Sequence, residues 1–322
     1  MPANQNNQPT STARKQEYHG TTWIDLENPS RETLAELAES YKLHPLQVEE
    51  CFSKDQLPQI EVEDEYVFLL IYFPKYISNE NRTVAAHVGI FLGKDYLITV
   101  HEEQTPVITD LFYAYEQGIG HKDAHLKKSP AFILHGIIAA LLVDISSMVH
   151  AITKDLDAIE VKVFDNEGSD AYAIGQLRQK IMKLRRIMYS LKDMSSELAS
   201  SIHAFSGENL VRQYSTNTKR VNKLWEAIEE SRETVEIYKD ADSTTNTEKT
   251  NSILAVLTLL FTLTIPATVF GTFYGMNVPV PGGIQTGPWT FFGPYTTLII
   301  IVVFSLLPIY FMMRYFRKKK WF

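Results

Sequence analysis

The stretch from Asn251 to Met313 contains no Asp, Glu, Lys or Arg, although these residues make up 21% of the 322-residue chain. Two apolar segments, Ile253–Phe273 and Tyr295–Tyr315, occupy most of it. Each is about 20 residues long, the length at which an apolar helix crosses a bilayer. We therefore predict two membrane-spanning helices at the C-terminus and expect the lipid bilayer as a partner.

The distribution of basic residues predicts the orientation of these spans. The sequence "RYFRKKKWF" follows the second span, whereas residues 274–294 between the spans carry no positive charge. Basic residues stay on the cytoplasmic side, so residues 316–322 are predicted to be a basic cytoplasmic tail and residues 274–294 an extracellular loop. Two spans return the chain to its starting side. We expect a protein of the cell inner (plasma) membrane with both termini in the cytoplasm.

Residues 1–17 are polar, lack the apolar region of a signal peptide and are predicted to be a disordered tail. Residues 18–128 are predicted to form an α/β cytoplasmic domain. Its expected strands lie around Trp23–Leu26, Glu65–Phe73, Val84–Leu92 and Asp95–Val100, with helices opening at Asn28-Pro29 and at Pro45, the latter capped by His44. The single Cys51 is expected to be core. No phosphate-binding loop and no nucleophile–base pair occurs, so we expect neither an enzyme nor an organic cofactor.

Helical periodicity dominates after Pro130. Residues 129–206 are predicted to form an antiparallel helix pair, and residues 207–273 a long stalk helix that continues into the first span. Part of this stalk follows a heptad pattern. The pattern consists of Leu210, Tyr214, Val221, Leu224, Ile228, Val235 and Tyr238, with Asn217 and Ser231 in the gaps. Such a seam predicts partner helices and supplies a reason for several chains to associate.

A polar stripe continues along the same helix. Steps of seven residues from Thr244 reach Asn251, Thr258, Ile265 and Thr272, and Thr262 and Thr268 flank this line. In a symmetric bundle the stripe would face the axis and offer oxygens to a hydrated ion. Alternatively, the threonines bond to carbonyls of their own helix or join helices together. For the stripe as a whole we favour a pore.

The tetrapeptide "YGMN" (Tyr274–Asn277) follows the first of the two spans directly, and the chain ends in "KKKWF". In this arrangement the sequence resembles the CorA family of divalent-cation channels, which includes magnesium channels of prokaryotes and mitochondria. Further similarity lies in "WIDLENPS", "LHPLQVEECF" and "YLITVHEE", and in the spacing of Gln56, Pro58 and Glu61. The resemblance covers essentially everything after the first twenty residues.

The resemblance implies an α+β membrane protein with the funnel shape of CorA. It also implies assembly as a homopentamer and no nucleic-acid partner. It implies Mg²⁺ uptake down the electrochemical gradient, with Co²⁺ and Ni²⁺ as further candidate ions. Gly275, Met276 and Asn277 would form the selectivity ring, whose oxygens accept hydrogen bonds from the hydrated ion. The implied pore-lining residues are Asn251, Leu254, Thr258, Ile265, Thr268 and Thr272. Leu254 and Ile265 would form apolar constrictions that gate by dewetting.

The sequence departs from the family pattern in several places. No acidic residue follows the GMN tripeptide, and Thr272 replaces a glycine common in the pore helix. Thr216 stands at a stalk position where the family's magnesium channels carry a regulatory acid. Asp240 matches another acidic stalk position and is a candidate regulatory Mg²⁺ ligand, or else a solvated carboxylate. His121 and His125 have a metal-ligand spacing, but their surroundings favour a surface loop.

Two alternatives remain open. A proton-coupled zinc transporter of the same family is one, although the GMN tripeptide often varies in that branch and is intact here. A non-conducting, membrane-anchored coiled-coil scaffold is the other. It predicts no need for the polar stripe or for Asn277.

Overall fold

The computed structural model describes residues 12–18, 20–53, 58–77, 82–102, 105–116, 129–164, 171–277, 279–283 and 286–318. The chain divides into two compact units, Met1–Ala241 (unit 1) and Asp242–Phe322 (unit 2). His121, His125 and Gln56, singled out in the sequence, lie outside the described residues.

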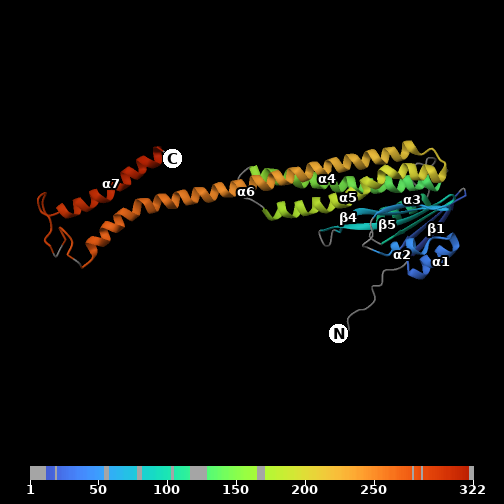
Figure 1. The fold of residues 1–322 in the computed structure, drawn as a ribbon, viewed down its shortest axis with the longest axis horizontal. Coiled ribbons are helices and arrows are strands. Elements are labelled where there is room, and N and C mark those ends of the chain that lie inside the picture. The colour runs from blue at the N-terminus through green and yellow to red at the C-terminus, as the bar shows by residue number, and fades with distance from the viewer. Residues whose placement is uncertain are drawn as a thin grey trace, which may run out of the picture. The chain divides into compact units, whose positions relative to one another are not determined.

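Unit 1 is built on a six-stranded mixed sheet with the order β1-β2-β6-β5-β4-β3. Figure 1 labels three of these strands, β1, β4 and β5. Strands β2 and β6 are parallel, whereas the other neighbouring pairs are antiparallel. The strands are β1 (Thr12–Tyr18), β2 (Thr21–Glu27), β3 (Gln59–Val62), β4 (Tyr66–Ile77), β5 (Arg82–Gly93) and β6 (Tyr96–His101). All four strands expected from the β-rich runs are therefore present.

Helices cover both faces of the sheet. On one face lie α1 (Arg31–Tyr41) and α2 (Pro45–Glu50), which His44 caps by accepting a hydrogen bond from the Leu46 amide, as expected. Cys51 is buried in this layer, and burial raises the pKa of its thiol to about 12, so the expectation that it is core is confirmed. On the other face α3 (Pro106–Glu116), α4 (Pro130–Phe164) and α5 (Ala171–Ser206) share a second core with the strands.

Helix α6 (Val211–Gly275) is continuous over 65 residues, and its first part belongs to unit 1. The heptad seam is buried there, but its partners lie in the same chain, in one core with residues of α4 and α5. Tyr214 donates a hydrogen bond to the Ala131 carbonyl at 2.6 Å, and the Asn217 amide donates to the His135 carbonyl at 3.1 Å. The inference that this seam draws several chains together was therefore wrong, because α4 and α5 already cover it.

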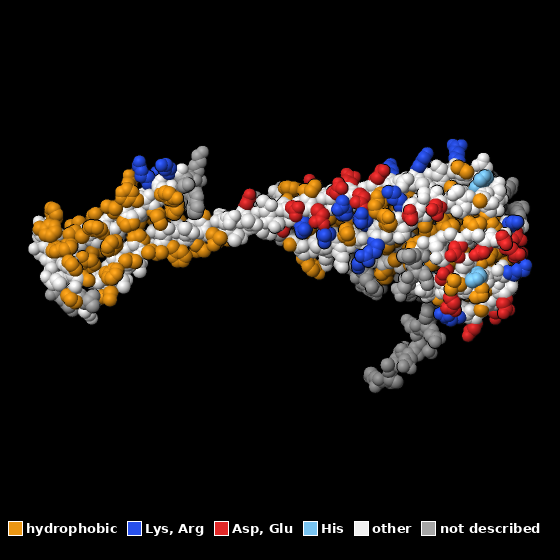
Figure 2. All heavy atoms as spheres, in the orientation of Figure 1, with side chains coloured by type: hydrophobic (Ala, Val, Ile, Leu, Met, Phe, Trp, Pro, Cys, Tyr) orange, Lys and Arg blue, Asp and Glu red, His pale blue; other side chains and the backbone are white. Residues whose placement is uncertain are grey.

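Unit 2 contains the end of α6 and α7 (Thr296–Lys318). Its helices expose apolar side chains, which Figure 2 shows as a nearly continuous cover, whereas charged side chains are scattered over unit 1. Within the described parts of the chain, three helices are long and apolar enough to cross a membrane: α4, α6 and α7. The two predicted spans thus occur as helices, and α4 is a third candidate by length and composition alone.

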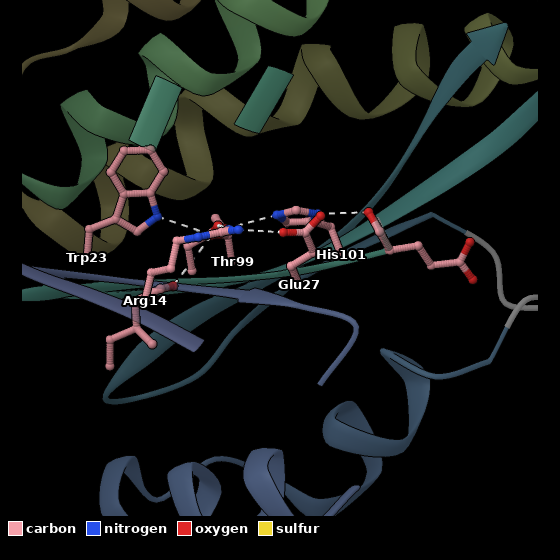
Figure 3. A network of polar contacts seen from close by, with 8 residues as sticks. Arg14, Trp23, Glu27, Thr99 and His101 are labelled. Atoms are coloured by element: carbon pink, nitrogen blue, oxygen red, sulfur yellow. Dashed lines mark hydrogen bonds and ion pairs between the residues drawn. The ribbon is translucent and has the colours of Figure 1, made fainter. Parts of the chain in front are cut away.

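Strand β1 corrects the prediction that residues 1–17 are disordered, since residues 12–17 belong to it. Its sequence is polar because the strand lies at the sheet edge, where it is joined to β2 through the backbone and through Arg14. Arg14 contacts Asp25 at 3.0 Å and Glu27 at 2.6 Å (Figure 3). Strand β1 therefore supplies the Arg14 guanidinium that pairs with the carboxylates of Asp25 and Glu27 on β2.

Asp25 is fully buried and contacts Arg14, Thr99 and His101, three residues that Figure 3 labels. It accepts hydrogen bonds from Thr99 at 2.7 Å and from His101 at 3.0 Å, and Trp23 donates to Thr99 at 3.1 Å. Burial alone would raise the pKa of Asp25, but the hydrogen bond and charge of His101, with the bonds from Thr99 and Arg14, hold it below its ordinary value. The network is thus a buried ion pair with several hydrogen bonds to its carboxylate.

Candidate functional site at the end of helix α6

The candidate selectivity tripeptide lies at the C-terminal end of α6. Gly275 is the last helical residue, Met276 and Asn277 follow it, and all three are exposed. The Met276 amide reaches the Phe273 carbonyl at 3.4 Å, a tighter turn than that of the helix body. The last carbonyls of a helix lack intrahelical donors and carry the negative end of its dipole. This end of α6 therefore offers uncharged oxygens in an environment that favours a cation.

A set of contacts holds the loop that follows. The Tyr274 hydroxyl donates a hydrogen bond to the Pro281 carbonyl at 3.0 Å. Gly282 has φ +73°, and a Cβ atom placed on it would lie 2.7 Å from the ring of Trp289. Glycine is thus required at this position both by the left-handed backbone and by the ring packed against it.

Thr297, in the first turn of α7, joins the two sides of this contact. Its hydroxyl donates to the Gly282 carbonyl at 3.2 Å and accepts from the Trp289 amide at 3.1 Å. We call Tyr274, Pro281, Gly282, Trp289 and Thr297 the loop clasp. The loop clasp was not predicted from the sequence, although the glycine pair 282–283 and the single tryptophan of this loop indicate close packing.

The predicted pore-lining threonines bond within their own helix. Thr258, Thr268 and Thr272 donate hydroxyl hydrogens to the carbonyls four residues earlier, at 2.7, 2.9 and 2.7 Å. This is the alternative considered from the sequence, but it does not exclude a role toward ions. A hydroxyl that donates to its own helix keeps its oxygen lone pairs as acceptors for water around a cation.

The remaining predicted pore residues are also exposed in the single chain, so the described residues of unit 2 leave the stripe uncovered. Asn251 is exposed, and the side chains of Leu254 and Ile265 are 53% and 54% exposed. Pro266, next to Ile265, lies inside α6 and cannot donate to the carbonyl four residues earlier. The stripe is therefore an exposed surface of α6 on which the apolar side chains of Leu254 and Ile265 interrupt the polar side chains.

The structure does not gather a metal site around Asp240. Asp240 is exposed on α6, and Thr216 donates its hydroxyl to the Arg212 carbonyl at 2.9 Å. The nearby Asp242 is buried and accepts from the Asn246 amide at 3.3 Å. Among the described residues, no three His, Cys, Asp or Glu side chains come close enough together to hold a metal ion. A site at Asp240 would therefore need ligands from another copy or from water.

Known proteins match nearly the whole chain. It is 24% identical over 303 residues to the cobalt/magnesium transport protein CorA of Thermotoga maritima, covering 93% of this chain and 83% of that protein. It is 28% identical over 256 residues to the putative metal ion transporter YfjQ of Bacillus subtilis, covering 79% and 78%. Both relatives are thus similar along most of their own length.

The fold is shared with a solved structure, the complete CorA magnesium transporter from Methanocaldococcus jannaschii. The TM-score is 0.74 at 18% sequence identity, over 91% of this chain and 90% of that one. This similarity confirms the predicted fold class, an α/β domain with long helices and apolar C-terminal helices. Residues 18–318 also match the family model described as CorA-like Mg²⁺ transporter protein. Because this match spans both units, the chain belongs to the family of CorA-like Mg²⁺ transporter proteins.

Proposed function

We propose that the protein is a divalent-cation channel that admits Mg²⁺ through an axial pore with the Gly275–Asn277 ring at its outer mouth. Co²⁺ and Ni²⁺ are further candidate ions. The observation that carries this proposal is the uncharged, exposed tripeptide at the carbonyl end of α6, directly beyond the candidate span. The family membership and the cobalt/magnesium relative support transport rather than enzymatic chemistry.

The chemistry of the tripeptide suits a hydrated ion. Mg²⁺ holds six waters tightly and loses them reluctantly, so a filter that recognises its water shell avoids the cost of dehydration. Carbonyl oxygens at the end of α6 and the side-chain amide oxygen of Asn277 would accept hydrogen bonds from those waters. Since these groups are neutral, the ion is attracted by dipoles but is not trapped by a fixed charge.

One chain has too few spans to enclose a pore, so the proposal requires several copies, and the family resemblance makes this a homopentamer. The exposed stripe of α6 would then line the axis, with Leu254 and Ile265 as apolar constrictions. Both termini would lie in the cytoplasm of a cell whose inner membrane holds the channel. A divalent ion entering such a cell gains about 4.6 kcal/mol per 100 mV, so no organic cofactor or nucleotide is needed.

Ion flux into proteoliposomes tests the proposal. We expect the wild type to admit Mg²⁺ without a proton gradient, and Asn277→Ala to lower the flux by about tenfold or more, because a ring of amide oxygens is lost. The matched control is Thr290→Ala, an exposed residue of the same loop whose side chain forms no hydrogen bond with any described residue. Absence of wild-type flux for every divalent ion would refute transport.

The same assay separates the alternatives. A proton-coupled zinc transporter would take up Zn²⁺ in preference to Mg²⁺ and only with a proton gradient. A non-conducting scaffold would show no flux, and Asn277→Ala would then have no effect on the membrane assembly. The proposed channel differs from both because Mg²⁺ moves under a membrane potential alone.

We also propose that Asp240 takes part in closing the pore when internal Mg²⁺ is high. The carboxylate is exposed, so copies of it around an axis could share a hydrated ion. Asp240→Ala should raise the internal Mg²⁺ concentration that halves the flux, whereas Glu248→Ala, an exposed acid further along the helix, should not. An unchanged midpoint in Asp240→Ala would remove this residue from regulation.

A further inference from the structure

Unit 2 contains an apolar pocket of about 440 Å³ between the end of α6 and the start of α7. The rings of Phe270, Tyr274, Trp289, Phe291 and Phe304 line it together with two isoleucines of α7. Phe270 and Phe304 meet at 6.1 Å between ring centroids, and Trp289 and Phe291 at 6.2 Å. The pocket is thus walled by large aromatic side chains from both helices and the loop.

The lining suits a flexible hydrocarbon better than a protein helix. Helices in membranes approach each other through small residues, and the lining contains no Gly, Ala, Ser or Thr. It also contains no charged residue, in keeping with the charge-free stretch from Asn251 to Met313. The hydroxyl of Tyr274, one of the lining residues, already donates a hydrogen bond to the Pro281 carbonyl. An occupant therefore needs no polar group and must fill an irregular space.

The surroundings of the pocket suggest where the occupant comes from. Residues of both candidate spans line the pocket, and Figure 2 shows that the side chains around these spans are mostly hydrophobic. Phe291 of the lining is 66% exposed, and Phe292 and Tyr295, which follow it in the chain, are 79% and 69% exposed. Aromatic residues gather in this way where a membrane protein leaves the hydrocarbon for the headgroup region.

We propose that this pocket binds an acyl chain of a membrane phospholipid, with the Trp289 ring near the headgroup end of that chain. The site rests on the membrane location in the proposed function but does not depend on ion conduction. It adjoins the candidate filter, because Trp289 packs against Gly282 in the loop clasp and Tyr274 precedes Gly275. A lipid bound here would touch the loop that follows the tripeptide.

Quenching of tryptophan fluorescence by brominated phosphatidylcholine tests the site in the full-length protein in liposomes. Trp321→Phe serves as the background, so that Trp23 and Trp225 of unit 1 are the other tryptophans. We expect bromine near the carboxyl end of the acyl chain to quench Trp289 more than bromine near its methyl end. Adding Trp289→Phe to the background should abolish this difference.

A second pair of variants distinguishes the pocket from general contact with lipid. Ile301→Phe adds volume on the pocket side of α7 and should lower the quenching of Trp289 by about half. Ile299→Phe places the same side chain about 200° around the helix and should leave quenching unchanged. Equal quenching in both variants would overturn the proposal. Trp289 protected from both bromine and aqueous acrylamide would also overturn it, because another copy of the chain would then fill the pocket.

These experiments can refute the proposed lipid site and the proposed ion channel independently of each other. Asn277→Ala should lose flux yet keep the depth-dependent quenching of Trp289. A protein that conducts Mg²⁺ but shows no quenching would retain the proposed function and lose the lipid site.

Discussion

Helices α4 and α7 are both long and apolar enough to cross a membrane, yet they differ in how much of their apolar surface is buried. Half of the apolar window of α4 is buried inside the protein, whereas 11% of the window of α7 is, and none of that of α6. The α4 side chains pack against the sheet of unit 1 and against α5 and α6. A similarly apolar stretch therefore contributes to a protein core in one unit and to an exposed surface in the other.

The difference lies in what accompanies the apolar residues. Helix α4 carries acidic and basic residues along its second half, such as Lys154, Asp155 and Asp157, and these lie on the surface of unit 1. The region from Asn251 to Met313 carries none, so its helices have no charged face. A helix that is apolar all round must be covered by other protein or by lipid. Apolar length alone does not separate the two cases, but the absence of any charged face does.

The largest effect expected from this contrast is on core stability. Ile137 of α4 is fully buried, so Ile137→Ala should lower the free energy of unfolding of unit 1 by about 2–5 kcal/mol through lost burial and a cavity. Ile253 of α6 is 62% exposed in the chain, and Ile253→Ala should lower it by less than about 0.5 kcal/mol. Denaturant unfolding in detergent, followed by the fluorescence of buried Trp23, measures both values.

Equal losses in the free energy of unfolding for Ile137→Ala and Ile253→Ala would contradict the difference between α4 and α6. A large cost for Ile253→Ala would mean that unit 1 depends on the packing of unit 2, for example through assembly of several copies. A small cost for Ile137→Ala would mean that the core of unit 1 collapses around the missing atoms. Either result would remove the distinction between a self-covered helix and an exposed one.

A smaller effect is expected at the loop clasp of unit 2. Thr297→Val keeps the shape of the side chain but leaves the Gly282 carbonyl and the Trp289 amide without their hydrogen-bond partner. The cost should be about 1 kcal/mol, seen as roughly fivefold faster amide exchange in residues 279–297. Exchange in α4 should stay unchanged, and so should that of the loop in the control Thr290→Val. Equal exchange in Thr297→Val and wild type would show that the clasp adds no stability.

Much of the fold followed from local patterns in the sequence. Strands β2, β4, β5 and β6 were predicted because β-branched and aromatic residues are concentrated in them, and α6 because proline and glycine are missing over most of its length. Strand β1 was missed because its polar sequence carries no such pattern. It forms through pairing with the next strand, β2, and through the contacts of Arg14 with Asp25 and Glu27, and neither is marked by a pattern within β1 itself.

Two further misses have the same physical origin. The heptad seam of α6 correctly predicted a buried face, but a heptad pattern does not say whether the partner helices belong to the same chain or to another. The loop clasp joins Gly282 to Trp289 and Thr297, and no periodic pattern marks such a contact. The GMN tripeptide was found by family resemblance, and its role stays a prediction. Tertiary contacts between separate segments are thus what the sequence left undetermined.

The smallest expected effect is a pH dependence that unit 1 should show and unit 2 should not. Burial alone would lower the pKa of His101, but the hydrogen bond and charge of Asp25 outweigh it and raise that pKa above its ordinary value. Folding thus favours protonated His101, so its stabilisation is complete below about pH 6.5 and is lost as pH rises through the raised pKa. The stretch from Asn251 to Met313 contains no His, Asp, Glu, Lys or Arg to respond in this range.

Denaturation midpoints of unit 1 between pH 6 and pH 8 should therefore fall with rising pH, and His101→Gln should flatten this slope. A slope that persists in His101→Gln would assign the titration to another group and leave the buried pair without a role in the pH response.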